Sequence, residues 1–286
     1  MKFIFFGSPE FAKIILAKLI DAGFIPAAVV CNPDRPVGRK KIVTPPPVKE
    51  VIREKGLEKS VQIFQPETLS SICSSLSSLS PDLFIVASYS KIIKKEILDI
   101  PKLGTIGVHP SLLPKYRGAS PIQSAILNGE IITGVTLYMI DEKVDNGPMI
   151  AQQEFPISNL QFPELLEKLA KLGGSMLVET LPKFLAGEIT PQEQDYDRAT
   201  FTKKFTTQDG FIENSDLEKA INEGGNIAVK IFNKIRALNP EPGTWTLRQA
   251  QGKLQRMKIL EAELTLENKL KLKTIQFEGA PRPKIL

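Results

Sequence analysis

The first 32 residues alternate apolar runs with a helical pattern, and this alternation constrains the fold more than any other feature. The apolar run at residues 3–6 stops at Gly7, as a short buried strand does. Pro9 suits the first position of a helix, and Gly23 suits its end. A second apolar run follows at residues 25–32. A strand, a helix and a strand in this order predict a parallel sheet with a right-handed crossover, the start of an α/β fold.

Later apolar runs extend this pattern over most of the chain. Residues 82–90, 104–109 and 134–141 each read as a further strand of the sheet. The apolar pattern lapses over residues 187–200, which predicts a linker. Residues 201–286 combine a helical stretch with short alternating runs, which predicts a small β-rich module.

The basic surplus of the chain lies in this second module. Residues 1–200 are neutral, and residues 201–286 supply the whole net charge of +5. A basic module beside a neutral one indicates an anionic partner such as nucleic acid. A well-solvated surface that binds nothing is the alternative.

Several classes of protein are disfavoured by what the sequence lacks. No apolar run reaches the ~20 residues needed to cross a bilayer, and the N-terminal apolar run is too short for a signal peptide. Cys31 and Cys73 stand alone and the chain has one histidine, which argues against a zinc site. We therefore expect a cytoplasmic protein without a metal.

The single histidine, His109, ends one of the predicted strands. Ligands bind at the carboxyl ends of parallel strands, so we expect the loops at residues 88–91, 109–118 and 141–147 to meet there. The last loop carries Asp145. A carboxylate beside an imidazole orients the ring, and such a pair can move a proton or stabilise an oxyanion. A structural histidine and an aspartate that merely forms a turn are the alternatives.

The segment GVHPSLLPKYRGASPIQSAILNGEIITGVTLYMIDEKVDNGPMIAQ, residues 107–152, strongly resembles the 10-formyltetrahydrofolate-dependent formyltransferases. The shared pattern is the histidine, the Ser-Leu-Leu-Pro loop after it, and an aspartate about three dozen residues later. The segments FFGSPEFA, NPDRPVGRKKIVTPPPVKEV and IRALNPEPGTWT resemble the members of the family that formylate methionyl initiator tRNA.

The resemblance implies a two-domain enzyme. Residues 1–200 would form a Rossmann-like catalytic domain, and residues 201–286 a tRNA-binding barrel similar to an OB fold but about two strands short. The implied reaction moves the formyl group of 10-formyltetrahydrofolate to the α-amino group of methionyl initiator tRNA, without a metal. We expect a monomer. Glycinamide ribonucleotide and nucleotide-sugar acceptors are alternatives, and so is a catalytically weak relative that binds tRNA or folate.

The resemblance also assigns roles to residues. His109 and Asp145 would be catalytic, with the protonated imidazole holding the oxyanion. The folate contacts would be Ser111, Leu112, Leu113, Pro114, Tyr89, Ser90, Ile140 and Asp141. The tRNA contacts would be Arg35, Arg39, Lys40 and Lys41, which cluster in a proline-flanked segment suited to phosphate binding.

Gly107 departs from the family pattern at a catalytic position. The family has an asparagine there, which is expected to hold the formyl oxygen together with the histidine. Loss of one such donor can lower the rate ~10²–10³-fold. We expect water, or one of Ser111, Asn146 and Ser90, to substitute for it. An asparagine introduced at Gly107 should then fit the vacant space and speed the reaction.

Overall fold

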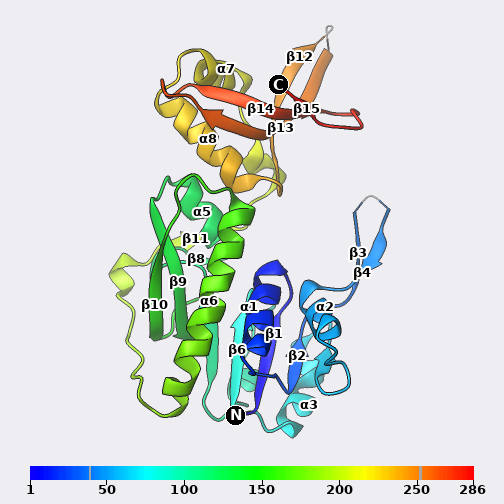
Figure 1. The fold of residues 1–286 in the computed structure, drawn as a ribbon, viewed down its shortest axis with the longest axis vertical. Helices are drawn as coiled ribbons and strands as arrows, with labels where there is room; N and C mark the ends of the chain where they lie inside the picture. Colours follow the sequence, from blue (N-terminus) through cyan, green and yellow to red (C-terminus); the bar gives the residue numbers. More distant parts are fainter. Residues whose placement is uncertain (39, 251–252) are drawn as a thin grey trace. The chain divides into compact units, whose positions relative to one another are not determined.

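The computed structural model describes residues 1–38, 40–250 and 253–286, and the chain separates into two compact units (Figure 1). Unit 1 comprises Met1–Gly118, Gly134–Phe155 and Leu166–Phe201. Unit 2 comprises Ala119–Thr133, Pro156–Leu165 and Thr202–Leu286. The bulk of unit 2 thus begins near residue 201, but unit 2 also includes two earlier segments. The division into a catalytic and a tRNA-binding domain stays a prediction.

Unit 1 is built on a seven-stranded sheet in the order β10-β9-β7-β6-β1-β2-β5. The strands are β1 (Phe3–Gly7), β2 (Ala28–Val30), β5 (Gln62–Phe64), β6 (Leu83–Ala87), β7 (Thr105–His109), β9 (Ile132–Met139) and β10 (Met149–Pro156). Strands β5, β2, β1, β6 and β7 run parallel, so the predicted parallel α/β fold is confirmed. Strand β1 has β2 on one side and β6 on the other, which makes its carboxyl end a topological switch point.

Strand β9 runs antiparallel to β7, with Gly107 opposite Tyr138 and His109 opposite Thr136. The loop at residues 141–147 therefore leaves the sheet beside the start of β7, where the Ile140 amide donates to the Thr105 carbonyl at 2.8 Å. Our expectation that three loops meet because their strands are parallel is wrong for this loop. Because β9 is antiparallel to β7, its carboxyl end lies beside the amino end of β7.

Helices cover both faces of this sheet. They are α1 (Glu10–Asp21), α2 (Pro47–Glu54), α3 (Cys73–Ser78), α4 (Lys95–Leu98) and α6 (Phe162–Leu185), with a 3₁₀ turn at Leu69–Ile72. Helices α1 and α6 lie on one face (Figure 1), where a Cβ at Gly173 of α6 would come within 2.9 Å of Val108. Apolar side chains of α3 and α4 pack on the other face, against Phe6 and Phe84. Such burial supplies most of the driving force for folding.

A hairpin extends from the connection between β2 and α2. Strands β3 (Arg35–Val37) and β4 (Ile42–Thr44) pair antiparallel and stand away from the sheet of unit 1 (Figure 1). The side chains of Val37, Ile42 and Val43 are exposed. The basic, proline-flanked segment is therefore a β-hairpin, and it presents apolar side chains to solvent as well as charged ones.

The segment predicted as a linker, residues 187–200, is ordered against unit 1. Gln192 pairs through its backbone with Met149, and Gln194 is only 3% exposed. After a 3₁₀ turn at Tyr196–Arg198, strand β11 (Phe201–Thr202) pairs with β8 (Arg117–Gly118). Hydrogen bonds hold this segment, and the sequence did not predict them because periodicity detects only apolar burial.

Unit 2 combines helices with an antiparallel sheet. The helices are α5 (Pro121–Leu127), α7 (Asn214–Asn222) and α8 (Asn226–Leu238), with a 3₁₀ turn at Thr207–Gly210. The sheet has the linear order β12 (Thr244–Ala250), β13 (Lys253–Leu264), β14 (Leu270–Phe277) and β15 (Lys284–Ile285). The predicted β-rich module is confirmed. Its linear order leaves β12 and β15 as edges, as expected for a shortened barrel.

Across the residues that the structure describes, no helix combines the length and apolar character needed to span a membrane.

Removing a side chain from the core of unit 1 should destabilise it. Ile97 is 1% exposed against Phe84 and its neighbours, so Ile97→Ala should lower the free energy of unfolding by about 2–4 kcal/mol. Urea unfolding followed by far-UV circular dichroism measures this change. The matched control is Ile92→Ala, because Ile92 is 82% exposed and its truncation should change stability by less than about 0.5 kcal/mol. Equal effects of the two substitutions would contradict this assignment of the core.

Candidate active site

His109 lies at the end of β7 and is 6% exposed. Its Nε2 atom is 2.9 Å from the backbone carbonyl oxygen of Tyr116. Because a carbonyl only accepts hydrogen bonds, this contact requires the proton on Nε2. The opposite nitrogen, Nδ1, then faces Asp145. The imidazole is therefore held between two oxygen atoms.

Asp145 contacts His109 although its loop starts beside the amino end of β7 and His109 lies at the carboxyl end. The loop folds back over the sheet, and the Asp145 Oδ2 atom lies 3.5 Å from His109 Nδ1. The Gly118 amide donates to the same oxygen at 2.6 Å. Asp145 has φ = 48°, a left-handed conformation that non-glycine residues adopt infrequently and that often marks functional sites. The predicted pairing of His109 with Asp145 is thus observed, by a different route from the one expected.

The second oxygen of this carboxylate has its own donor. The Tyr138 hydroxyl donates to Asp145 Oδ1 at 2.6 Å from strand β9. Burial, followed by the nearby charge of Asp145, raises the pKa of Tyr138 well above its ordinary value. The phenol therefore keeps its proton at neutral pH and acts as a donor. Tyr138 was not identified from the sequence, because a tyrosine within an apolar strand is typical of a residue of the hydrophobic core.

A buried polar network braces the Asp145 loop. The Arg117 guanidinium, on a residue 3% exposed, donates to Asn146 Oδ1 at 2.9 Å and to Gln194 Oε1 at 2.7 Å. Gln194 in turn donates to the backbone carbonyls of Asp145 at 3.0 Å and Gly147 at 2.8 Å. These contacts fix the loop from both sides. Arg117 lies in the 109–118 loop that begins with the histidine and could have been suspected, whereas nothing in the polar run around Gln194 distinguishes that residue.

Gly107 has no vacant space beside it, so our expectation of a substituting water is wrong. A Cβ built on Gly107 would lie 2.4 Å from Cε1 and 2.7 Å from Cζ of Tyr138. The tyrosine ring occupies the place that an asparagine would need. Gly107→Asn should therefore clash and slow the reaction, contrary to the sequence-based expectation.

The side chains named as alternative donors are all engaged elsewhere. The Ser111 hydroxyl donates to the Lys115 carbonyl at 2.7 Å, and the Asn146 amide donates to Asp141 Oδ2 at 2.7 Å. The Ser90 hydroxyl donates to Asn32 Oδ1 at 3.1 Å. None of these contacts directs a donor from these groups toward the imidazole.

The Ser111–Pro114 loop is held against β9 and β10. The Thr136 hydroxyl donates to the Ser111 carbonyl at 2.7 Å, and Gln152 Nε2 donates to the Leu113 carbonyl at 2.9 Å. Ser111 and Leu113 are buried, whereas Leu112 and Pro114 keep some exposed surface. Only the latter two have side-chain surface available to a ligand in this conformation.

The remaining residues predicted to bind folate follow β6 and β9. Tyr89 packs its ring edge-on against Phe6, and its buried hydroxyl has no hydrogen-bond partner among the residues described. Burial raises the pKa of Tyr89 to about 12, so this hydroxyl is a free donor at neutral pH. Ile140 and Asp141 lie at the start of the loop that carries Asp145, and Asp141 accepts from the backbone amide of Lys143 at 2.9 Å.

The chain is similar to known proteins over most of its length. A family model described as formyl transferase matches residues 1–181. The chain is 41% identical over 249 residues to a methionyl-tRNA formyltransferase of Kosmotoga olearia, covering 86% of this chain and 76% of that protein. The chain belongs to the formyl transferase family. It is also 41% identical over 251 residues to a methionyl-tRNA formyltransferase of Enterococcus faecalis, covering 87% of this chain and 76% of the relative.

Solved structures show the same fold as this formyltransferase. A methionyl-tRNA formyltransferase from Clostridium thermocellum superposes with a TM-score of 0.59 at 16% identity, covering 97% of this chain and 98% of the other. An N-formyltransferase from Helicobacter canadensis, solved with folinic acid and dTDP-3-aminofucose, superposes with a TM-score of 0.61 at 21% identity. That match covers 93% of this chain and 88% of the other.

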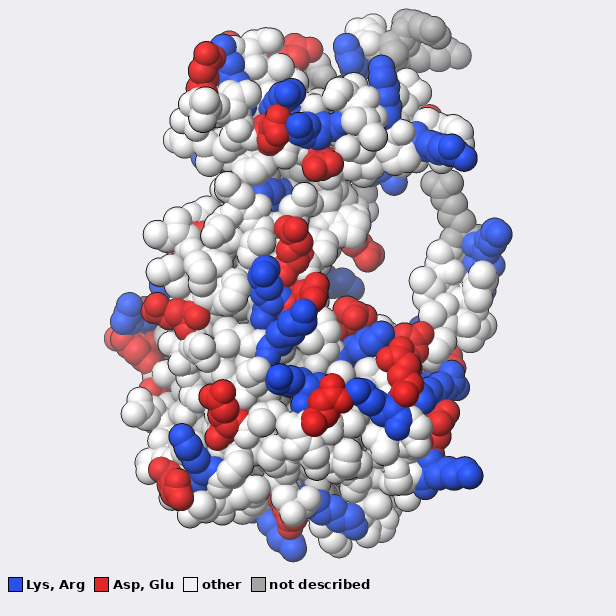
Figure 2. Space-filling model, viewed as in Figure 1, with Lys and Arg blue, Asp and Glu red and all other residues white. Residues whose placement is uncertain are grey.

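Three of the residues predicted to contact tRNA, Arg35, Lys40 and Lys41, lie on the β3–β4 hairpin of this formyltransferase. Arg35 forms an exposed ion pair with Glu67 at 2.8 Å, and Lys40 and Lys41 lie exposed at the turn. Arg39 lies outside the described residues. Figure 2 shows basic and acidic side chains interspersed over the visible face of unit 1 rather than separated by sign. Any preference for phosphate on that face is therefore local to segments such as the hairpin.

Gln194 should contribute to the stability of the protein. Gln194→Ala would leave a buried guanidinium and two carbonyls short of partners, so we expect a loss of about 1–3 kcal/mol in unfolding free energy, measured in urea. Gln192→Ala is the control, because it removes the same side chain from an exposed position two residues away. If the two variants behaved alike, the network would not be what braces the loop.

Proposed function

We propose that this chain transfers the formyl group of 10-formyltetrahydrofolate to the α-amino group of methionyl initiator tRNA in the cytoplasm. The observation that carries the proposal is the pairing of the only imidazole with Asp145. This pair occurs in a chain about 40% identical to methionyl-tRNA formyltransferases over most of its length. In this proposal residues 1–200 carry catalysis and residues 201–286 bind tRNA, and the protein acts as a monomer.

The chemistry requires the net transfer of one proton from the amine to the folate N10, and the stabilisation of one negative charge. The free amine attacks the formyl carbon, the carbonyl oxygen gains charge, and the bond from that carbon to the folate N10 then breaks. One proton leaves the attacking amine and one is supplied to N10, so that no net proton is consumed. Asp145 is suited to accept the amine proton, directly or through water. A positively charged imidazole at His109, held by Asp145 and Tyr116, would stabilise the charge that develops on the oxygen.

The folate co-substrate would be bound beside this pair. The unpartnered hydroxyl of Tyr89 supports the proposal, because a buried donor without a partner is unfavourable unless a ligand satisfies it. Leu112 and Pro114 offer apolar surface on a loop that Thr136 and Gln152 hold rigid. Rigid apolar walls with a few polar groups are typical of sites for flat heterocycles.

The β3–β4 hairpin would contact the tRNA. Its turn carries Lys40 and Lys41, whose charges suit phosphate oxygens, and its strands expose Val37, Ile42 and Val43. Exposed apolar side chains on a projecting hairpin favour a partner that covers them. A hairpin with exposed apolar and basic side chains is suited to binding in a groove of a nucleic acid, where both kinds of side chain would be covered.

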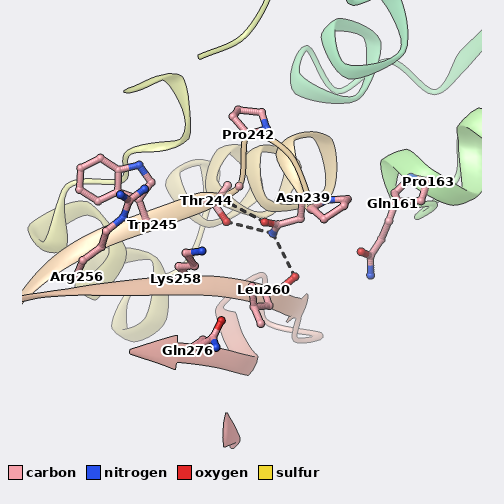
Figure 3. Close-up of a pocket in the computed structure, with 12 residues that line it drawn as sticks. Gln161, Pro163, Asn239, Pro242, Thr244, Trp245, Arg256, Lys258, Leu260 and Gln276 are labelled. Carbon is pink, nitrogen blue, oxygen red and sulfur yellow. Dashed lines mark hydrogen bonds between the residues drawn. The ribbon is translucent and has the colours of Figure 1, made fainter. Parts of the chain in front are cut away.

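A pocket in unit 2 supports a second tRNA contact. Its volume is about 340 Å³, and its lining includes Trp245, Arg256 and Lys258 (Figure 3). The Arg256 guanidinium lies 4.1 Å from the centroid of the Trp245 ring, whose indole nitrogen donates to the Thr207 carbonyl at 2.8 Å. Basic groups beside an aromatic ring suit the phosphates and unstacked bases of RNA.

Substitution of either catalytic residue should abolish most of the activity. We expect His109→Ala and Asp145→Ala each to lower formyl transfer at least about 100-fold, because each removes part of one charged pair. The double variant should be little slower than either single variant, since groups that act as a unit are not additive. Single-turnover transfer of labelled formyl to methionyl initiator tRNA measures these rates. Wild-type turnover in either variant would contradict the mechanism.

The same assay separates the acceptor classes. Wild-type protein should formylate methionyl initiator tRNA in preference to glycinamide ribonucleotide or a dTDP-amino sugar. Faster transfer to either small acceptor would overturn the proposed substrate. Absence of transfer to any of the three would overturn the assignment as an enzyme.

The hairpin lysines should contribute to the salt dependence of tRNA binding. Each phosphate contact adds about −0.9 to the slope of log K against log salt for duplex nucleic acid, so Lys40→Ala with Lys41→Ala should flatten the slope by up to about 2. Affinities measured at several salt concentrations give the slope. The control, Lys168→Ala with Lys171→Ala, removes the same charge from exposed positions of α6 and should leave the slope unchanged. Equal slopes for the two double variants would exclude the hairpin contact.

A further inference from the structure

The Asp145 carboxylate is held by different groups at its two oxygens. Oδ2 accepts from the Gly118 amide and faces His109, whereas Oδ1 accepts from the Tyr138 hydroxyl at 2.6 Å. A carboxylate bound at one oxygen only can rotate about its Cβ–Cγ bond. The Tyr138 hydroxyl is the side-chain donor recorded on Oδ1 in the described structure, so it restricts this rotation.

We propose that Tyr138 is a positioning residue for formyl transfer, whose hydroxyl, seated over Gly107, holds the Asp145 carboxylate in the orientation that meets His109. This inference rests on the function proposed above. Tyr138 is 5% exposed, so it acts through Asp145 rather than by touching a substrate. Its ring also meets the imidazole edge-on, with centroids 6.5 Å apart and planes at 88°, which limits the space in which either side chain can turn.

Gly107 is the second half of this arrangement. It lies opposite Tyr138 in the β7–β9 ladder, where paired residues direct their side chains to the same face of the sheet. A methyl group on residue 107 would meet the tyrosine ring at 2.4 Å and Ile140 Cγ1 at 3.0 Å. The ring can therefore keep this position, with its hydroxyl bound to Asp145, only if residue 107 lacks a side chain. We infer that the glycine and the tyrosine work as a pair.

Tyr138→Phe removes the hydroxyl and keeps the ring. We expect kcat to fall about 10- to 100-fold, the effect of losing one hydrogen bond to a charged group. The KM values for folate and for tRNA should stay within about twofold, because no substrate contact is lost. Tyr196→Phe is the matched control, since it removes the same hydroxyl from a ring that is 50% exposed, and it should leave both parameters unchanged.

The single histidine supplies a readout independent of activity. His109 is the only imidazole in the chain, so its ring ¹⁵N resonances are assigned without further variants. Release of the carboxylate in Tyr138→Phe should shift the Nδ1 resonance, which faces Asp145, and leave the Nε2 resonance, which faces Tyr116, nearly unchanged. Tyr196→Phe should shift neither resonance.

A double-variant cycle tests the pairing with Gly107. Gly107→Ala should lower kcat in the wild-type background because the added methyl displaces the ring. In a Tyr138→Ala background the same change should cost little more, since the ring is gone and only the contact with Ile140 remains. Losses that simply multiply would show that the two residues act independently.

The outcomes separate this inference from the proposed function. If wild-type protein transfers formyl but Tyr138→Phe keeps its kcat, or if kcat falls while both KM values rise, the positioning role is wrong. If wild-type protein transfers no formyl, the proposed function fails, and the ¹⁵N resonances still decide whether Tyr138 orients Asp145. An unchanged Nδ1 resonance in Tyr138→Phe would then overturn the inference.

Discussion

The carboxylate of Asp145 is the point at which the polar contacts of the site converge. It faces the imidazole of His109, accepts from the Gly118 amide, and accepts from the Tyr138 hydroxyl. A partly buried carboxylate is unfavourable unless its oxygens are satisfied, and these partners come from different strands or loops. The Asp145 side chain therefore adopts this position only if β7, β8 and β9 are correctly placed relative to one another.

The loop that carries Asp145 is fixed by polar contacts rather than by an apolar core. Arg117 and Gln194 form the brace, and Gln194 arrives from a segment about 50 residues further along the chain. Hydrogen bonds are directional, so such a brace sets the orientation of a backbone more closely than apolar packing does. A loop held in this way can keep Asp145 in a left-handed conformation without a glycine at that position.

The neighbourhood of Gly107 shows how two neighbouring strands can compensate for each other. The missing side chain on β7 is matched by a large aromatic residue at the opposing position of β9. Interiors are close-packed, so volume lost at one position must be filled from another. A reading of β7 alone predicts an empty space, and only the partner strand shows that the space is filled.

The sequence by itself determined the α/β class and the β-rich second module, and it indicated the pairing of His109 with Asp145 that the structure contains. Periodicity and glycine placement are local properties, and the resemblance rests on short motifs that are contiguous in the chain. The tertiary structure decided the direction of β9, the ordered course of residues 187–200, and the contacts of Tyr138, Arg117 and Gln194. These features depend on which strand pairs with which and on hydrogen bonds between residues distant in the chain. Neither strand pairing nor a distant hydrogen bond changes the periodicity of the sequence. An antiparallel strand has the same local pattern as a parallel one, and a buried polar side chain the same local pattern as an exposed one.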